Sequence, residues 1–301
     1  MKAALLPDRG VVKLGGKDAR KFLNGLVTAD VGKVSEQSPR FAALLTPQGK
    51  IIVDFIIVDA DLATGEDFYL DCPRAHATAL VERLGFYKLR AKIAIEDVSD
   101  IVGVMAIWDG AAPAHWGVCY PDPRIPELGL RCISPPQPAD AAAAFGAELT
   151  DAAAYEAHRI RLGVPAGGLD FVYGDAFPHE ADMDQLNGVD FDKGCFVGQE
   201  VVSRMEHRGS ARTRVVQVAL GGAVPPVGTA ITAAGKPVGV MGSAVNDSGL
   251  AALRLDRVAE AMASGLALQA QGTQLRPVKP TWARFAFPGD PQPVLDPKAA
   301  P

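Results

Sequence analysis

One cysteine among glycines and cations is the strongest chemical candidate in this sequence. Cys195 lies in the run Lys-Gly-Cys-Phe-Val-Gly-Gln-Glu at 193–200, and Arg204, His207 and Arg208 follow within a short stretch. Nearby cations favour the thiolate, which is the nucleophilic and metal-ligating form of a thiol. We therefore expect Cys195 to be accessible and to react before the other three cysteines. The alternative is a buried structural residue, since free cysteine is among the most buried residue types.

The residues beside Cys195 could position it or hold a ligand. Glycines at 194 and 198 permit positive φ and a close approach of the backbone. Between Ser203 and Arg214 the cations are opposed only by Glu206, so this stretch could activate the thiol or hold an anionic group. The candidate binding residues of the segment are Lys193, Gly194, Gln199, Glu200, Arg204 and Arg208.

Two carboxylates outside this segment are also candidates. Asp54 lies inside an otherwise apolar strand, residues 51–58, where a charge is costly unless it has a partner or faces a cavity. It could line a binding channel or lie on the solvent side. Glu180 could bind a ligand or could be an acid at a helix start, which the helix dipole favours. The spacing of His179, Glu180 and Asp182 does not support a metal site, and we expect none.

The composition is that of an ordinary globular protein. The 301 residues are 48% hydrophobic and 22% charged, with a net charge of −5, which predicts two or three domains and argues against a nucleic-acid partner. The apolar runs are too short for a signal peptide or a membrane span, so we expect a cytoplasmic protein without a membrane partner. The four cysteines form no CxxC pair and are predicted to be reduced thiols. They are Cys72, Cys119, Cys132 and Cys195.

The elements that must position these residues indicate an α+β fold with mixed sheets. A turn at 47–49 predicts a hairpin between strands 41–46 and 50–58. The Pro/Gly-rich stretch 121–138 is predicted to be a surface connection, and a helical segment is expected at 140–162. After Thr213, short β-branched runs separated by turn residues predict a small antiparallel β-barrel. Further strands are expected at 10–14, 68–70, 90–95 and 101–108, and further helices at 17–27 and 75–84.

The run at 193–200 resembles the hallmark of the YgfZ-type folate-binding proteins. These proteins are similar to the glycine-cleavage T-protein and are implicated in making or repairing iron–sulfur enzymes. The resemblance extends in order through segments 16–30, 45–50 and 161–165 and through Pro178-His179-Glu180.

This resemblance implies a T-protein-like folate-binding fold with a central channel. It implies two interleaved subdomains in residues 1–209, with a linker near 121–138, followed by the β-barrel at 210–288 and a disordered tail at 289–301. The implied cofactor is tetrahydrofolate or a derivative. A carboxylate can accept hydrogen bonds from both N–H groups of a pterin edge, and in this family that role falls on Glu180. Asp54 would lie near the reactive nitrogens of the folate.

Two candidate functions, which belong to different classes of protein, are consistent with these residues. The first is a tetrahydrofolate-binding factor that supports assembly or repair of iron–sulfur enzymes through Cys195, with the assembly machinery or client enzymes as partners. The second is a folate-dependent aminomethyltransferase or demethylase in which the Asp54 carboxylate has the electrostatic role in catalysis. The cysteine favours the first, because one-carbon transfer to tetrahydrofolate has no evident need of a thiol. A catalytically silent interaction module is a third possibility.

Overall fold

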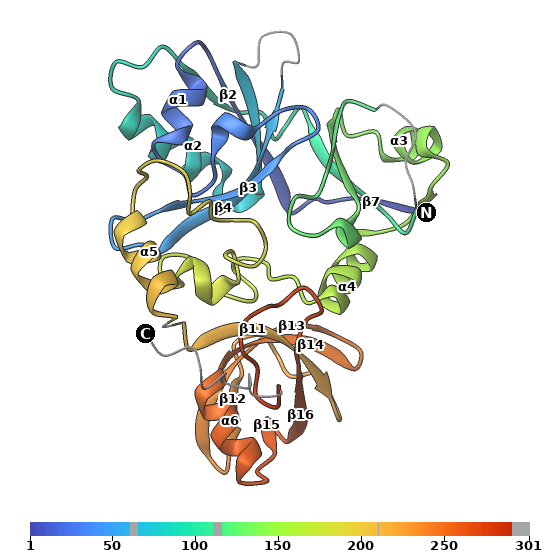
Figure 1. The fold of residues 1–301 in the computed structure, drawn as a ribbon. Helices are drawn as coiled ribbons and strands as arrows, with labels where there is room; N and C mark the ends of the chain where they lie inside the picture. The colour runs from blue at the N-terminus through green and yellow to red at the C-terminus, as the bar shows by residue number, and fades with distance from the viewer. Residues whose placement is uncertain (61–65, 111–115, 210, 291–301) are drawn as a thin grey trace, which may run out of the picture.

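The computed structural model describes residues 1–60, 66–110, 116–209 and 211–290. It contains two five-stranded sheets and a closed β-barrel, with the barrel below the sheets in the view of Figure 1. The tail expected at 289–301 lies outside the described residues from position 291 onward.

The first sheet carries the predicted hairpin and has the strand order β3-β4-β5-β2-β6. The turn between β3 and β4 contains Gly49, whose φ of +83° suits a glycine. One face of the sheet packs against α1 and α2 through a core of apolar residues. The bounds are β2 Arg9–Gly15, β3 Arg40–Leu45, β4 Ile51–Asp59, β5 Asp67–Pro73, β6 Ala94–Asp97, α1 Ala19–Asn24 and α2 Ala77–Lys88.

The second sheet has the order β10-β1-β7-β9-β8. Its strand β1 precedes β2 of the first sheet in the chain, so the two sheets are interleaved in sequence. A second core lies between the sheets and includes Trp108, Tyr120 and Tyr155. The bounds are β1 Lys2–Leu5, β7 Gly103–Trp108, β8 Val118–Pro121, β9 Leu130–Ser134, β10 Glu148–Leu149, α3 Pro138–Phe145 and α4 Ala152–Leu162.

The stretch 121–138 is not a surface connection, as the sequence suggested. It contains a short 3₁₀ helix, Pro126–Leu128, and the sheet strand β9. Leu128, Cys132 and Ile133 are buried. The helical segment expected at 140–162 is two helices, because Gly146 ends α3 in a left-handed conformation and β10 intervenes.

The prediction of four reduced cysteines is wrong for one pair. Cys119 on β8 and Cys132 on β9 lie directly opposite in the antiparallel ladder and form a disulfide. They are 13 positions apart in sequence, so this pairing depends on strand register, which spacing alone does not reveal. Cys72 and Cys195 are free.

The C-terminal barrel is closed, as predicted, with the order β11-β14-β13-β12-β15-β16. Helix α6 packs against its strands, and apolar side chains fill its interior. Among the described helices, none is both long enough and apolar enough to cross a bilayer. The bounds are β11 Thr213–Leu220, β12 Ala230–Ala233, β13 Lys236–Val245, β14 Ser248–Arg254, α6 Leu255–Ala263, β15 Leu268–Ala270 and β16 Thr273–Val278.

Candidate functional site

Cys195 lies at the exposed tip of the loop that leads into α5, Gln199–Arg208. Two neighbours in the loop are buried and hold it in place: Lys193 on one side and Phe196 on the other. The Phe196 ring joins the core between the sheets, 5.1 Å from the Lys193 ammonium. The loop therefore buries the residues that flank the Gly194-Cys195 tip and presents the thiol to solvent.

The Lys193 ammonium is held in a cage of backbone carbonyls. Its Nζ donates to the carbonyl oxygens of Asn24, Val27 and Ala29 at 2.7, 2.7 and 2.9 Å. Burial lowers the pKa of Lys193 to about 8, against the opposing effect of the Asp30 carboxylate. All three donor positions of the ammonium are thus used to tie the cysteine loop to the end of α1. This geometry makes Lys193 a tether of the loop, whereas the sequence suggested an electrostatic partner of the thiol.

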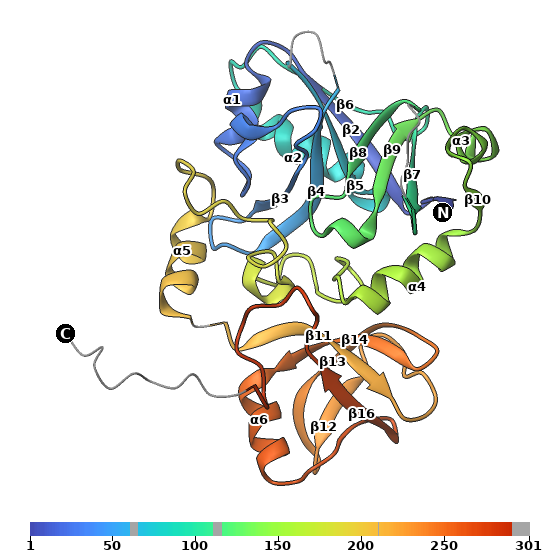
Figure 2. The same cartoon turned by 45° about the vertical axis from the view of Figure 1, so that its right-hand side comes forward.

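Gly198 fixes the direction in which the loop enters α5. Its φ is +81°, and a Cβ atom there would lie 2.7 Å from the carbonyl oxygen of Thr46. The backbone of Gly198 lies against Gly49 in the β3–β4 turn, and Figures 1 and 2 show the hairpin beside α5. Gly194, in contrast, is not in the left-handed region and has open space around it.

Replacing Lys193 with methionine is expected to loosen the loop without slowing the thiol. Three buried carbonyls would lose their donor, which costs on the order of 1–3 kcal/mol of unfolding free energy. We expect faster amide hydrogen exchange at 191–198 and a lower melting temperature. Alkylation of Cys195 should be as fast as in the wild type or faster. Lys193→Arg is the matched control, because it keeps the charge but does not fit the cage; slow alkylation in the methionine variant alone would restore the electrostatic role.

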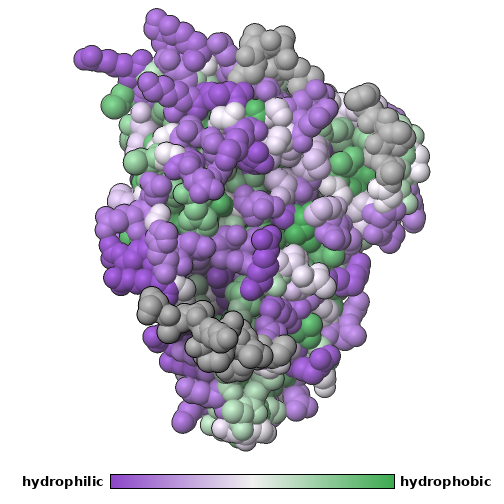
Figure 3. Space-filling view, viewed as in Figure 1, coloured by the Kyte–Doolittle hydropathy of each residue, from purple (hydrophilic) through white to green (hydrophobic). Residues whose placement is uncertain are grey.

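The cations of α5 and of the start of β11 are less free than the sequence suggested. Arg204 forms an ion pair with Glu200 one helical turn earlier. Arg214 is buried, and its Nη2 binds Asp184 at 3.0 Å. Arg208 is exposed at the end of the helix. Hydrophilic side chains gather over α5 in the space-filling view, so the helix presents a mixed polar face next to the cysteine loop (Figure 3).

Glu180 lies in a short 3₁₀ helix, Pro178–Ala181, that packs against α5. One oxygen of its carboxylate accepts the backbone N–H of Phe177 at 3.0 Å, so Glu180 caps the start of this helix. The neighbouring His179 is buried, and its Nε2 lies 3.0 Å from Glu206 of α5. These contacts join the segment 177–181 to the helix that follows Cys195.

Ligand atoms of His179, Asp184 and Glu206 lie within 4.8 Å of one another. This grouping differs from the His179, Glu180 and Asp182 set considered from the sequence. The Arg214 guanidinium already binds the Asp184 carboxylate, and a cation placed there would be repelled by that arginine. We therefore assign no metal to this group.

Asp54 faces a cavity of about 880 Å³ that lies between the two sheets and α4. This central cavity is lined by polar and apolar groups from β4, β9, α4 and the β1–β2 turn. The Tyr173 hydroxyl donates to the Asp54 carboxylate. Burial and the adjacent Asp54 raise the pKa of the Tyr173 phenol, so it remains a donor at all ordinary pH values. The sequence left open whether Asp54 faces a channel or solvent, and the structure places it in the cavity wall.

A buried network of alternating charges forms part of the cavity wall. Asp71 of β5 accepts from Arg9 at 2.6 Å and from Arg131 of β9 at 2.7 Å. Arg131 also binds Asp122, which in turn binds Arg124 at 2.7 Å. Because Asp71 belongs to the first sheet and Arg131 to the second, this network joins the two sheets. Sequence analysis missed these residues, since a charge on a strand shows its burial only once the topology is known.

The predicted site residues thus fall in separate places. Asp54 lies in the central cavity, and Glu180 caps the 3₁₀ helix beside α5, outside the set of residues that line the cavity. The remaining predicted residues lie in the cysteine loop and α5. They are Lys193, Gly194, Cys195, Gln199, Glu200, Arg204 and Arg208.

Comparison with known proteins bears on both the fold and the family. Residues 212–285 match the family described as "CAF17, C-terminal beta-barrel domain". "Iron-sulfur cluster assembly factor IBA57 homolog, mitochondrial" of Mycosarcoma maydis is 34% identical, over 85% of this chain and 74% of that protein. The chain belongs to the IBA57 family of iron–sulfur cluster assembly factors. The human "Iron-sulfur cluster assembly factor IBA57, mitochondrial" is 29% identical, over 84% of this chain and 77% of that protein.

Another IBA57 homolog, from Neurospora crassa, is 31% identical over 74% of this chain, which spans about half of its length (55%). The expected cytoplasmic location is wrong by this comparison, because the IBA57 relatives are named as mitochondrial proteins. The resemblance to YgfZ-type proteins remains a prediction.

A solved structure extends the fold comparison to nearly the whole chain. The glycine cleavage system aminomethyltransferase T from Bartonella henselae superposes with a TM-score of 0.72, over 95% of this chain and 87% of that chain. At 15% sequence identity this likeness shows the fold alone. The prediction of a T-protein-like α+β fold with a C-terminal barrel is confirmed.

Proposed function

We propose that this IBA57-family protein assembles or repairs iron–sulfur enzymes through the thiol of Cys195. The observation that carries the proposal is the exposed thiol at the tip of a loop whose neighbours, Lys193 and Phe196, are buried. A thiolate is the usual protein ligand of an iron–sulfur cluster. One thiol is too few to hold a cluster alone, so Cys195 would act together with thiols of a partner, either an assembly protein or a client enzyme.

We also propose that the central cavity holds a tetrahydrofolate. Its volume of about 880 Å³ lies within the range of small-molecule sites. The cavity offers the Tyr155 ring and His76 for contact with a flat ring system, and Arg74, which also pairs with the exposed Asp100, for an anionic tail. These groups fit a folate. Its contribution here would be binding alone, since Asp54 is already occupied by Tyr173.

The contact between Glu180 and the pterin stays a prediction, because Glu180 lies outside the residues that line the central cavity, and a pair of variants tests it. If the Glu180 carboxylate accepts from the pterin, Glu180→Ala should weaken tetrahydrofolate binding by ~1.5–3 kcal/mol. Glu180→Gln keeps an acceptor for the Phe177 N–H, so it separates the helix cap from the ligand contact. We expect both variants to lose affinity in calorimetry. Equal affinity in Glu180→Gln and wild type would assign Glu180 to capping alone.

The fold of an aminomethyltransferase favours a second candidate function, one-carbon transfer to tetrahydrofolate. We expect little or no transfer by the purified protein, because the hydrogen bond from Tyr173 stabilises the Asp54 carboxylate and hinders its approach to a substrate. The measurement is turnover of an aminomethyl donor with tetrahydrofolate, in wild type and in Asp54→Asn. Enzyme-like turnover that Asp54→Asn abolishes would replace the first function with the second.

The proposed function itself is tested in cells that lack the protein. Activities of several iron–sulfur enzymes should fall, while enzymes without clusters should not. Expression of this chain, delivered to mitochondria, should restore them. Unchanged iron–sulfur enzyme activities in the depleted cells would contradict the proposal.

A further inference from the structure

The end of α2 exposes two large apolar side chains. Phe86 is 76% exposed and Leu89 is 90% exposed, the highest values among the large hydrophobic residues of the described chain. The two residues lie within four positions of each other at the end of α2, and we refer to them together as the protrusion. Apolar area of this kind is unfavourable in water and is typical of a surface that binds something.

Leu89 also has a strained backbone. It follows the last residue of α2 with a φ of +42° and a ψ of −107°. Glycine is the usual residue where a helix ends with a positive φ, because it has no Cβ to clash. A leucine that is 90% exposed gains no packing in return. Strain without a packing benefit points to a use of this side chain outside the monomer.

Four cations flank the protrusion in the sequence: Arg83, Lys88, Arg90 and Lys92. No aspartate or glutamate occurs from position 83 to position 95. Within the part of the chain that the structure describes, none of the four forms an ion pair. The whole chain has a net charge of −5. The Asp18 carboxylate accepts the backbone N–H of Lys92, so the excess of positive charge lies at Arg83, Lys88 and Arg90, where it attracts an acidic partner.

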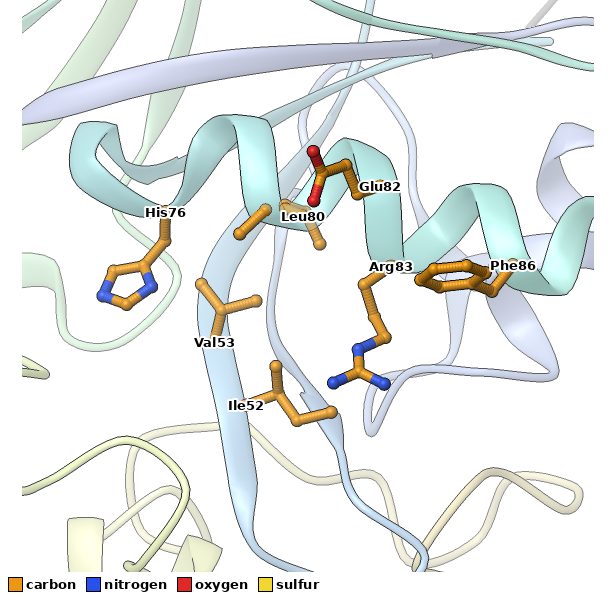
Figure 4. A pocket seen from close by; sticks show the side chains of 8 residues that line it. Ile52, Val53, His76, Leu80, Glu82, Arg83 and Phe86 are labelled. Carbon is orange, nitrogen blue, oxygen red and sulfur yellow. The ribbon is translucent and has the colours of Figure 1, made fainter.

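A groove of about 240 Å³ lies directly beside Phe86, between α2 and β4. Figure 4 shows Phe86 and Arg83 along one side of it and the apolar side chains of Ile52 and Val53 along the other. Glu82 is the one carboxylate among its lining residues. The groove is large enough to receive an apolar side chain that projects from a partner.

The groove and the cysteine loop both adjoin the core of the first sheet. Ile52 in the groove and Val197 in the loop pack against the same apolar core. The backbone of Gly198 also lies against Gly49, which precedes β4 and Ile52 by only a few residues. A partner seated on α2 and β4 would therefore adjoin the hairpin against which Gly198 of the cysteine loop packs.

We propose that this α2–β4 surface, composed of the groove (Ile52, Val53, Leu80), the protrusion (Phe86, Leu89) and the four cations (Arg83, Lys88, Arg90, Lys92), docks a protein that presents an apolar side chain ringed by carboxylates. A protein partner fits better than a lipid bilayer, because a groove is filled by a projecting side chain and a bilayer surface offers none. The proposal does not depend on the thiol or on folate. It names the kind of partner that this surface would bind.

Selection of a random peptide library against the purified full chain tests the docking surface. Enriched peptides should carry several Asp or Glu residues around a Leu, Ile or Phe. Binding of the best peptide should weaken about tenfold or more, which is ~1.4 kcal/mol, in Phe86→Ser and in the double variant Arg83→Glu, Arg90→Glu. The matched control is Lys236→Glu, Arg276→Glu, which makes the same charge change on exposed barrel residues and should leave binding unchanged. Cys195→Ala should also bind normally, so a failure of docking is distinct from a failure of the thiol.

The variant Leu89→Gly is expected to change stability and peptide binding in opposite directions. Relief of the strained backbone should raise the melting temperature, while loss of the apolar side chain should weaken peptide binding. A variant that is more stable but binds less well cannot be explained by misfolding. Selected peptides without acidic residues, or binding that survives Phe86→Ser and both charge reversals, would overturn the proposal. So would co-sedimentation with vesicles of phosphatidylcholine and phosphatidylglycerol that Phe86→Ser abolishes, because that result would assign the surface to a membrane.

Discussion

Replacement of Cys195 by alanine is expected to abolish restoration of iron–sulfur enzyme activity in cells that lack this protein. The thiol is exposed at the tip of its loop, so its removal leaves the fold intact while it removes the one accessible free sulfur among the described cysteines. Cys195→Ser is the stricter variant, because it keeps the shape and polarity of the side chain. A serine hydroxyl is far less acidic than a thiol and is a poor iron ligand at neutral pH, so we expect it to fail as well.

Cys72 provides the matched control for this experiment. It is fully buried, and burial raises the pKa of its thiol to about 12, so it is inert towards alkylation and towards metals. Cys72→Ala should lower the melting temperature because it leaves a small cavity, but it should restore the enzymes. Activity that survives in both Cys195 variants would return Cys195 to a structural role.

Much of the fold could be predicted from local signals. The hairpin at 47–49 and the closed barrel after Thr213 follow from turn residues and short β-branched runs, and both are present. The exposure of Cys195 was also predicted, from the cations near it in the sequence, and it is present. Strand β9 was not, because the Pro and Gly residues on either side of it suggested a loop. It is a strand because it pairs with β7 and β8, and this pairing cannot be read from the local sequence.

In the candidate site, the directions of the side chains were harder to predict from the sequence than the elements that carry them. Lys193 is two positions from Cys195, yet its ammonium points into the carbonyls at the end of α1. Proximity in sequence predicted that Lys193 acts on the thiol. The prediction was wrong because a long flexible side chain can reach groups on another element. The pairing of Asp71 with Arg9 and Arg131 was likewise invisible, since the partners lie 62 and 60 positions away.

The second large effect is expected at this pairing. Asp71→Asn should lose ~3–5 kcal/mol of unfolding free energy, because it removes one partner of a buried ion pair. Asp71 is fully buried and accepts from Arg9, Arg131 and the Tyr120 hydroxyl. An asparagine keeps the shape but leaves two arginines without their shared counter-charge. Urea unfolding at neutral pH measures the loss. Asp100→Asn is the control, because Asp100 also binds an arginine but is exposed, and it should change stability little.

The loss of stability in Asp71→Asn should depend on pH. Burial alone would raise the pKa of the Asp71 carboxyl, but Arg9 and Arg131 outweigh burial, so the pKa lies below its usual value. A carboxyl with a depressed folded-state pKa stabilises the fold fully above its unfolded pKa of about 4. This contribution is lost as the pH falls towards the folded-state value. The stability difference between wild type and Asp71→Asn should therefore be constant from pH 8 to pH 5, and it should shrink below about pH 4. A difference that stayed constant on acidification would mean that the variant acts through altered packing of the two sheets, and not through loss of the charge.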